Sequence, residues 1–394
     1  GKIRQIRDAK DRVVAAYKYD KKTGNLLRST DMAGNEIYFS YDKEGLLTLV
    51  SRSEDDLDER PLVGIKYDAR SNPTQVMKLN TEGKSVWDTR LTYNQHGDVT
   101  SVATPTGRTA MKYNDFARIT QQTDPFGLTS TRKYDKFNRL TEAIAPNGSV
   151  VTYTYLNTGA IGEIKRFAAM DKQQLLSSVQ FTYDAVGQVV RVSDNNGRTR
   201  KFDRDAEGKV IKEYFPDDSA VGYQFTPAGQ LKQTMDPNGH RIGFKWSKLG
   251  KLDALTTAVG QTADYEYDKY GLLVGLKNVW KNQTDRAVSY SYDKYDRLEK
   301  VYFGGGKVKT MKYDRLGKII EVVAADGDNV KREGLSYDQF DQLAEKTVTE
   351  SVKGKEVSKL VYQYAYLPNG QRTKLAVKLP NGTMRQTAWN YDLN

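Results

Sequence analysis

The sequence predicts an all-β protein, in which tandem β-hairpins form one long, curved, spiralling antiparallel sheet. Three observations predict this fold class. Aromatic residues recur at a regular spacing, two kinds of turn signature alternate between them, and the segments between the turns alternate apolar with polar residues. Composition agrees, because 26 tyrosines suit half-buried strands whose rings pack while their hydroxyls reach water or backbone. The 32 glycines suit many tight turns.

A recurring aromatic residue, called the anchor below, ends one strand of each predicted hairpin. The steps from Tyr113 to Tyr134 and from Tyr134 to Tyr155 are both 21 residues, which sets the base period. Longer gaps predict extended hairpin loops. The pattern predicts one repeat array over residues 1–394, with about 17 repeats and truncated at both ends. The predicted anchors are Tyr19, Tyr41, Tyr67, Tyr93, Tyr113, Tyr134, Tyr155, Tyr183, Phe202, Phe225, Trp246, Tyr267, Tyr292, Tyr313, Tyr337, Tyr366 and Tyr391.

Two turns are predicted in each repeat. The first directly follows the anchor and reads Asp-x-x-Gly, and the second lies roughly half a period later. Aspartate can accept hydrogen bonds from the backbone ahead of it, proline fixes φ near −65°, and glycine tolerates positive φ. This chemistry predicts a type I turn closed by a left-handed residue, which is a common hairpin connection. The clearest predicted turn residues are Asp124, Pro125, Gly127, Gly187, Asp236, Pro237, Gly239 and Gly317.

The segments that lead into the anchors alternate in phase. Val288, Tyr290 and Tyr292 share one face, while Ser289 and Ser291 take the other. A period of two with aromatic and β-branched residues indicates half-buried strands, and the shared phase predicts a single continuous sheet. Roughly 34 strands at ~4.8 Å give a ribbon ~160 Å long. Because sheets twist, we expect the ribbon to make an arc or one loose turn around a lumen ~50 Å across.

These repeats resemble a known family. The Tyr-Asp pair and the turn after it are best matched by YDKFNRL at Tyr134, YDAVGQV at Tyr183, YDKYDRL at Tyr292 and YDRLGKI at Tyr313. They resemble the YD repeat of RHS proteins, over essentially the whole chain. The resemblance implies a spiralling β-shell. In bacterial polymorphic toxins and toxin complexes such a shell encloses a toxic polypeptide, and in teneurins a similar shell serves cell-surface adhesion. The self-cleaving core segment of the bacterial proteins has no counterpart in the repeats, so no cleavage role is carried over.

The sequence offers little material for catalysis or cofactor binding. Cysteine is absent, which removes disulfides, thiolate nucleophiles and cysteine-ligated metals. The only two histidines, His96 and His240, lie in or beside predicted turns and are interpreted as exposed loop residues. Most aspartates open turns and so have a structural explanation. We therefore predict no catalytic residue, no metal site and no cofactor, and a protein that is not an enzyme.

The leading functional hypothesis is a structural β-shell that encapsulates or carries a polypeptide, such as a toxin. Its partners would be that cargo or the remaining parts of the same shell. The alternative is an extracellular adhesion or glycan-binding surface that uses rim loops such as residues 51–61 and 168–178. A nucleic-acid partner is disfavoured, because the formal charge of +11 is spread without a dense basic run. No segment approaches the ~20 apolar residues of a membrane span. We expect the full-length protein to be secreted or displayed at a bacterial cell surface.

Overall fold

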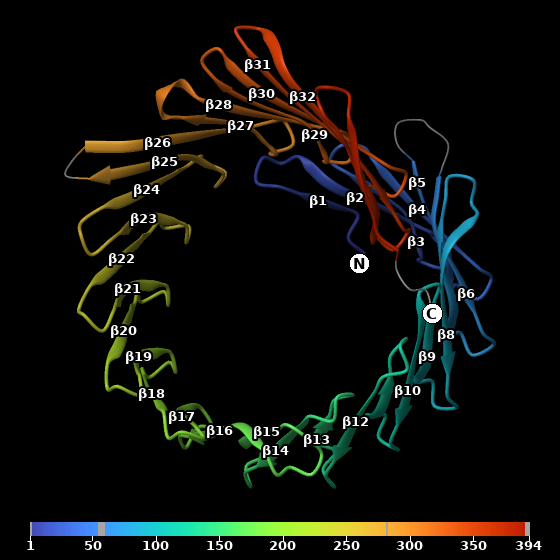
Figure 1. The fold of residues 1–394 in the computed structure, drawn as a ribbon, viewed down its shortest axis with the longest axis vertical. Helices are drawn as coiled ribbons and strands as arrows, with labels where there is room; N and C mark the ends of the chain where they lie inside the picture. Colours follow the sequence, from blue (N-terminus) through green and yellow to red (C-terminus); the bar gives the residue numbers. More distant parts are fainter. Residues whose placement is uncertain (1, 54–59, 281–282, 391–394) are drawn as a thin grey trace.

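The computed structural model describes residues 2–53, 60–280 and 283–390. Over these residues 34 strands form one open antiparallel sheet, and the only helical element is a single 3-10 turn, η1 (Gly304–Gly306). Each strand contacts the strands that precede and follow it in the sequence. The predicted fold class is confirmed, since the chain forms one long curved sheet of hairpins (Figure 1).

The strands are short, and most have five to nine residues. The first twelve are β1 (Gln5–Arg7), β2 (Val13–Tyr19), β3 (Leu26–Asp31), β4 (Glu36–Tyr41), β5 (Leu47–Ser53), β6 (Arg60–Tyr67), β7 (Pro73–Leu79), β8 (Ser85–Tyr93), β9 (Val99–Thr104), β10 (Gly107–Tyr113), β11 (Ile119–Thr123) and β12 (Thr129–Tyr134). The next twelve are β13 (Leu140–Ile144), β14 (Val150–Tyr155), β15 (Ile161–Phe167), β16 (Leu175–Tyr183), β17 (Val189–Asp194), β18 (Thr199–Arg204), β19 (Val210–Tyr214), β20 (Ala220–Phe225), β21 (Leu231–Met235), β22 (Arg241–Trp246), β23 (Leu252–Thr256) and β24 (Thr262–Tyr267). The last ten are β25 (Leu273–Trp280), β26 (Gln283–Tyr292), β27 (Leu298–Phe303), β28 (Val308–Tyr313), β29 (Ile319–Asp326), β30 (Asn329–Tyr337), β31 (Leu343–Val352), β32 (Lys355–Tyr366), β33 (Arg372–Lys378) and β34 (Met384–Ala388).

The ribbon has two long edges that differ in the kind of turn they carry. Every even-numbered strand from β2 to β32 ends at an anchor position, and an anchor turn follows it. Every odd-numbered strand whose following segment the structure describes is followed by the second kind of turn, called the mid-turn below. Because neighbouring strands are antiparallel, all anchor turns lie along one edge, the anchor-turn edge. All mid-turns lie along the other, the mid-turn edge.

Each anchor coincides with a β-bulge. Lys133 pairs with Glu142, but the next residue, Tyr134, pairs with Leu140, so the register shifts by one residue at the anchor. The same shift occurs at the anchors of the other hairpins, for example at Tyr313. A bulge bends its strand and increases the local twist. A bulge repeated at the same end of every second strand therefore curves the sheet in one consistent sense.

The turns have the geometry that their residue types predict. The Asp135 Oδ1 atom accepts hydrogen bonds from the backbone N–H groups of Phe137 and Arg139, both at 2.9 Å. In the mid-turn at Asp124 the same oxygen accepts from the N–H groups two and four residues ahead, also at 2.9 Å. Gly127, at the fourth position of that turn, has φ +79°. These hydrogen bonds and φ values fix each tip of the ribbon without help from neighbouring repeats.

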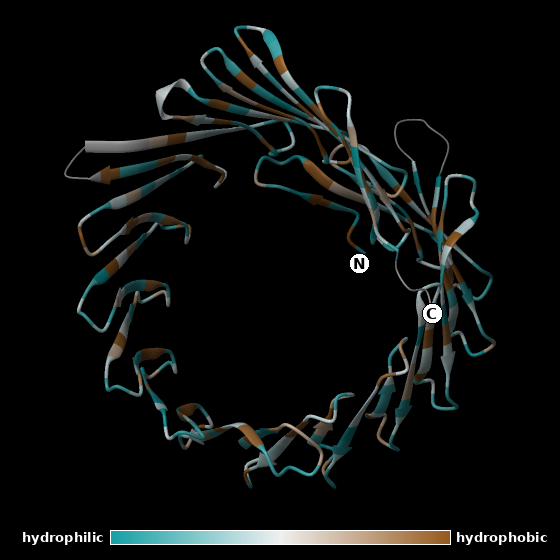
Figure 2. Ribbon diagram, in the orientation of Figure 1, coloured by the Kyte–Doolittle hydropathy of each residue, from teal (hydrophilic) through white to brown (hydrophobic). Residues whose placement is uncertain are grey.

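The wall is a single layer with almost no enclosed core. Among the described residues only a few apolar side chains are buried, and they are scattered over separate strands: Val150, Val301, Met311, Val348 and Ala376. Hydrophobic and hydrophilic residues alternate along the ribbon (Figure 2). The sheet is therefore held by its hydrogen-bond ladders and by stripes of half-buried side chains on neighbouring strands.

The fourth position of the anchor turn gives a direct test of backbone strain. Gly187 has φ +85° with open space around its Cβ position, whereas Ala117 adopts φ +58° at the equivalent place. Left-handed backbone costs a residue with a Cβ roughly 1–2 kcal/mol. We therefore expect Gly187→Ala to lower, and Ala117→Gly to raise, the free energy of unfolding in urea by about 1 kcal/mol.

The control is Gly334→Ala, because Gly334 lies within β30 at negative φ with no atom near its Cβ position. This substitution should be neutral or slightly stabilising. Equal losses in Gly187→Ala and Gly334→Ala would show that turn strain is not the cause.

Candidate functional site: the anchor ladder and the coil seam

The anchor side chains form a ladder of hydrogen bonds between neighbouring strands. Pairing of β11 with β12 stops at Gln121 and Thr131, so the anchor-turn ends of the two strands diverge. The Tyr134 hydroxyl closes this gap by donating to the carbonyl oxygen of Ile119, the first residue of β11, at 2.9 Å. The same bond to the first residue of the preceding strand is made by Tyr41, Tyr67, Tyr93, Tyr113, Tyr155, Tyr183, Tyr267, Tyr292, Tyr313 and Tyr337.

Some anchor hydroxyls lie in half-buried settings that favour their protonated form. Burial raises the pKa of the Tyr292, Tyr313 and Tyr337 hydroxyls above the ordinary tyrosine value. A neutral hydroxyl retains its proton and can donate it to a carbonyl. Each of these tyrosine anchors thus combines ring packing with one fixed hydrogen bond to the neighbouring hairpin.

Two anchor positions keep the same role with another side chain. Trp246 donates its indole N–H to the Leu231 carbonyl at 2.7 Å. In the repeat of β18 the position before the turn is held by Arg204, whose guanidinium donates to the carbonyls of Val189 and Gly208. The prediction of Phe202 as the anchor is therefore wrong, because Phe202 lies two residues upstream of the bulge. Tyr391 lies outside the described residues.

Spacing would have identified Arg204 where residue type did not. Tyr183, Arg204, Phe225, Trp246 and Tyr267 follow one another at steps of 21 residues. A search for aromatic residues misses an arginine, although arginine has both the apolar stem and the donors that the position needs.

A seam forms where the second coil of the ribbon passes the first. Figure 1 shows the last strands overlying the first strands after more than one full turn. Asp296, in the anchor turn after β26, pairs with Lys10 at 2.6 Å and with Arg12, both in the mid-turn after β1. Asn35, beside the mid-turn after β3, donates to the Arg315 carbonyl at 3.1 Å. The seam thus joins the anchor-turn edge of the second coil to the mid-turn edge of the first.

The seam fixes the size of the coil. The turn after β26 meets the turn after β1, and the turn after β28 meets the turn after β3, so one coil takes 25 strands. At about 4.8 Å per strand this corresponds to a contour of ~120 Å and a diameter of ~40 Å. The coil is tighter than the loose single turn expected from 34 strands. An odd number of strands per coil is required, because anchor turns must meet mid-turns.

Two seam turns place aspartate where most anchor turns have glycine. Asp296 and Asp341 occupy the fourth turn position with φ +61° and +63°. Both carboxylates pair with cations of the first coil. Asp296 pairs with Lys10 and Arg12, and Asp341 pairs with Arg52 at 3.0 Å. Asp341 also pairs with Lys318 at 2.7 Å. Strained backbone persists where the surroundings compensate for it, and here the compensation is an ion pair across the seam.

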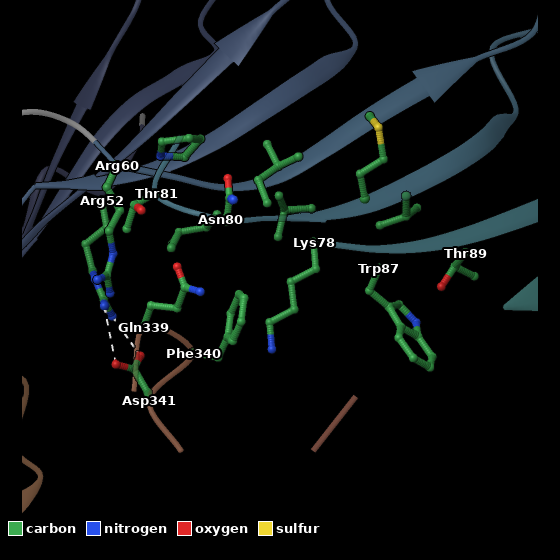
Figure 3. Close-up of a pocket in the computed structure, with 16 residues that line it drawn as sticks. Arg52, Arg60, Lys78, Asn80, Thr81, Trp87, Thr89, Gln339, Phe340 and Asp341 are labelled. Atoms are coloured by element: carbon green, nitrogen blue, oxygen red, sulfur yellow. Dashed lines mark hydrogen bonds and ion pairs between the residues drawn. The ribbon is translucent and has the colours of Figure 1, made fainter. Parts of the chain in front are cut away.

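A cavity of about 310 Å³ lies in the seam between β5–β8 and the anchor turn after β30. Figure 3 shows Phe340 reaching from that turn beside Lys78 of the first coil, with Asp341 below Arg52. The Lys78 ammonium is 4.4 Å from the centre of the Phe340 ring and donates to the Pro368 carbonyl at 2.8 Å. The Phe340 ring is therefore a knob from one coil seated in a groove of the other.

The remaining candidate residues lie apart from one another. The His240 Nδ1 atom is 2.9 Å from the Asp236 carboxylate, and this contact lowers the pKa of Asp236. His240 is largely exposed beside the mid-turn after β21, and His96 is exposed in the anchor turn after β8. In the part of the chain that the structure describes, no helix is both long and apolar enough to cross a membrane. Residues 54–59 of the predicted 51–61 rim loop lie outside that part.

Comparison with known proteins places this wall in a family. A family model described as Teneurin YD-shell matches residues 50–263, more than half of the chain. The chain belongs to the teneurin YD-shell family. A curated relative of this YD-shell chain is double-stranded DNA deaminase toxin A of Burkholderia cenocepacia (strain H111), 30% identical over 127 residues. The match covers 32% of the YD-shell chain and only 8% of that relative, so the chain spans a small part of the relative's length.

Solved structures of toxin complexes are also similar to the YD-shell chain. The TcdB2-TccC3 crystal structure is 13% identical, with 95% of this chain and 27% of that chain covered, at a TM-score of 0.48. The same complex without its hypervariable C-terminal region is 14% identical, with 98% of this chain and 28% of that chain covered, at a TM-score of 0.48. A Photorhabdus luminescens Tc holotoxin pore is 12% identical, with 96% of this chain and 24% of that chain covered, at a TM-score of 0.39.

The anchor hydroxyl is expected to contribute to stability beyond ring packing. Tyr313→Phe keeps the ring but removes the donor to the Leu298 carbonyl, which is 2.7 Å away. A neutral hydrogen bond in this setting is worth about 1 kcal/mol. We expect that loss in the free energy of unfolding measured in urea. Tyr302→Phe, at a tyrosine that is 40% exposed, is the control and should change stability by less than half as much.

The seam is expected to loosen in acid. Hydrogen bonds from Lys10 and Arg12 lower the pKa of the Asp296 carboxyl. A carboxyl with a lowered folded-state pKa stabilises the fold above its unfolded value, near 3.9, and loses that contribution as pH falls through the folded-state pKa. The seam should therefore stay closed at neutral pH and open below about pH 4.

The distance between spin labels at Glu82→Cys and Asn369→Cys would report this opening, since the chain has no native cysteine. These labels sit in turns on opposite sides of the seam, near Lys78 and Pro368. Labels at Glu82 and His96, both in the first coil, form the control and should keep their distance. Asp296→Gly removes the ion pair and the strained backbone together, so it should shift the opening to higher pH.

Proposed function

We propose that this chain is a non-catalytic wall segment that encloses or carries a polypeptide cargo. The observation that supports it best is the ring in Figure 1, where one continuous sheet curves through more than a full turn and docks on itself along the seam. A wall of this kind acts by steric exclusion. It keeps an enclosed chain away from other proteins and needs no reactive side chain.

Family membership and the toxin relative support a cargo of this kind. A stretch of 127 residues of the chain is 30% identical to a protein named as a double-stranded DNA deaminase toxin, of which it matches only a small part. We propose that the YD-shell chain occupies a similar place in a larger toxin-carrying protein, beside a separate active domain. A secreted or cell-surface location follows from that role and belongs to the same proposal.

The alternative expected from the sequence is an adhesion or glycan-binding role, and an experiment needs to separate it from enclosure. An adhesion or glycan-binding role would use the outer surface or the turn-bearing rims. An enclosed cargo would instead contact one face of the sheet only. Adjacent residues of a strand point to opposite faces, which makes the two readings distinguishable at residue level.

Gln121 and Gln122 in β11 form a matched pair for this test. They are the same residue type, are both partly exposed and point to opposite faces. Gln122 pairs with Met111 and so shares the face of the Tyr113 anchor, whereas Gln121 pairs with Lys112 and takes the other face. In β29 the equivalent pair is Ala324, on the anchor face, and Ala325.

The experiment fuses a cysteine-free, unfolded polypeptide to the end of the chain and introduces one cysteine at a time at these four positions. A short thiol-linked photo-crosslinker then reports contact with the fused polypeptide. We expect several-fold stronger crosslinking from one face, with Gln122 and Ala324 behaving alike and opposite to Gln121 and Ala325. Equal crosslinking from both faces would contradict enclosure and favour the adhesive reading.

A further inference from the structure

The face of the sheet opposite the anchors carries an excess of exposed lysine. Because side chains alternate along a strand, the residue directly before each anchor points to this face, called the basic face below. That row holds two carboxylates, Asp203 and Glu266, and six exposed lysines: Lys18, Lys66, Lys112, Lys133, Lys245 and Lys312. Lys133 and Lys312 pair with glutamates of the next strand, whereas the other four lysines form no ion pair with the described residues.

Unpaired cations gather on the basic face of β17–β22. The register of these strands places five of them there, four exposed and the last half-buried: Arg191, Lys201, Arg241, Lys245 and Lys212. Asp203 is the only acidic residue that these strands place on the same face. The anchor face of the same strands differs, since its Arg200 pairs with Glu213 at 3.2 Å. The basic face of β17–β22 is therefore a patch of positive charge that the chain itself does not neutralise.

Two cations of this patch stand directly opposite each other. Arg191 pairs in register with Lys201, so the two side chains project from adjacent strands on the same face. Like charges at directly opposite positions destabilise a sheet. The nearby Asp203 does not pair with them, and it accepts a hydrogen bond from the Tyr214 hydroxyl at 2.8 Å. A carboxylate from a partner, seated between Arg191 and Lys201, would replace the repulsion with two charge-assisted contacts.

The patch favours an acidic polypeptide over a nucleic acid. Proteins that hold single-stranded nucleic acids combine positive charge with aromatic side chains on which bases stack. Tyr214 is the only aromatic residue that β17–β22 place on the basic face, and the Lys212 ammonium covers its ring at 4.6 Å from the centre. The six strands span ~24 Å, which an extended polypeptide crosses with about seven residues. The patch therefore fits a short acidic stretch of extended chain.

We propose that the basic face of β17–β22 binds an acidic, extended segment of the polypeptide cargo, with a carboxylate between Arg191 and Lys201. This inference rests on the proposed function, because it names the kind of cargo and the face of the wall that the cargo meets. The patch lies away from the seam in the ring (Figure 1). Coils join along their turn edges, so a neighbouring coil leaves the face of these strands open to cargo.

Fluorescence anisotropy of labelled peptides tests the proposal on the intact chain. The probes are a peptide of about ten residues that alternates glutamate with serine, and two analogues with glutamine or lysine in place of glutamate. We expect only the glutamate peptide to bind at about 20 mM salt. Its binding should be lost near 500 mM salt, because exposed charges are then screened over a few ångströms.

A matched pair of variants locates the binding surface. The patch variant carries Arg191→Gln, Lys201→Gln and Lys245→Gln, and should weaken binding of the glutamate peptide at least about tenfold, since three charge-assisted contacts are lost. The control variant removes the same charges from exposed positions of the anchor face, with Arg166→Gln, Lys309→Gln and Lys331→Gln. It should bind like the parent. Glutamate at the three patch positions should instead bind the lysine peptide, a gain that misfolding does not produce.

Crosslinking to a fused acidic polypeptide separates this inference from enclosure itself. Crosslinks should come mainly from Gln121 and Ala325, which share the basic face. Stronger crosslinks from Gln122 and Ala324 would overturn the inference and leave enclosure standing, whereas equal crosslinks from both faces would contradict enclosure. The inference also fails if the glutamine peptide binds as well as the glutamate peptide, or if the control variant loses as much affinity as the patch variant. Tighter binding of a short DNA duplex than of the glutamate peptide would show that the partner class is wrong.

Discussion

The wall depends on the hydrogen bond that most anchors make to the strand behind them. At Tyr134 the backbone ladder has already ended, and the phenol spans the remaining gap to Ile119. The register shift at the same residue bends the strand, so one position both joins neighbouring hairpins and curves the sheet. A single-layer sheet with few buried side chains has no core to impose curvature. The curvature therefore has to be built into each repeat, as the anchors do.

The parts of this design that are local could be predicted from the sequence. Asp-x-x-Gly turns follow from side-chain chemistry within four residues, and the alternating strands follow from a period of two. Arg204 was not predicted as an anchor, because the anchor pattern was defined by aromatic residues and an arginine at the 21-residue spacing does not fit it. The bulges and the 25-strand coil were also not predicted. The size of a coil depends on small twists that add up over many strands, and no single repeat reveals their total.

The seam was beyond sequence reasoning for a different reason. Its partners lie 280 to 290 residues apart, and every repeat offers similar turns as candidates. The one local signal was aspartate in place of glycine at Asp296 and Asp341, where left-handed backbone disfavours any side chain. Such a substitution is disfavoured within its own turn. At these two positions a cation on the other coil compensates for the strain.

The choice of turns as the contact surface also explains how so long a sheet avoids pairing with other sheets. Within the described residues, β1 and β34 alone are paired on one side, and every other strand pairs with a neighbour on both sides. Coils therefore meet through side chains at their turns, which bind side chains and carbonyl oxygens of the other coil. An edge of turns is selective, because knobs, grooves and charges must match, whereas an open strand edge accepts almost any extended chain. A long wall can thus dock on itself in one register without exposing the backbone that drives aggregation.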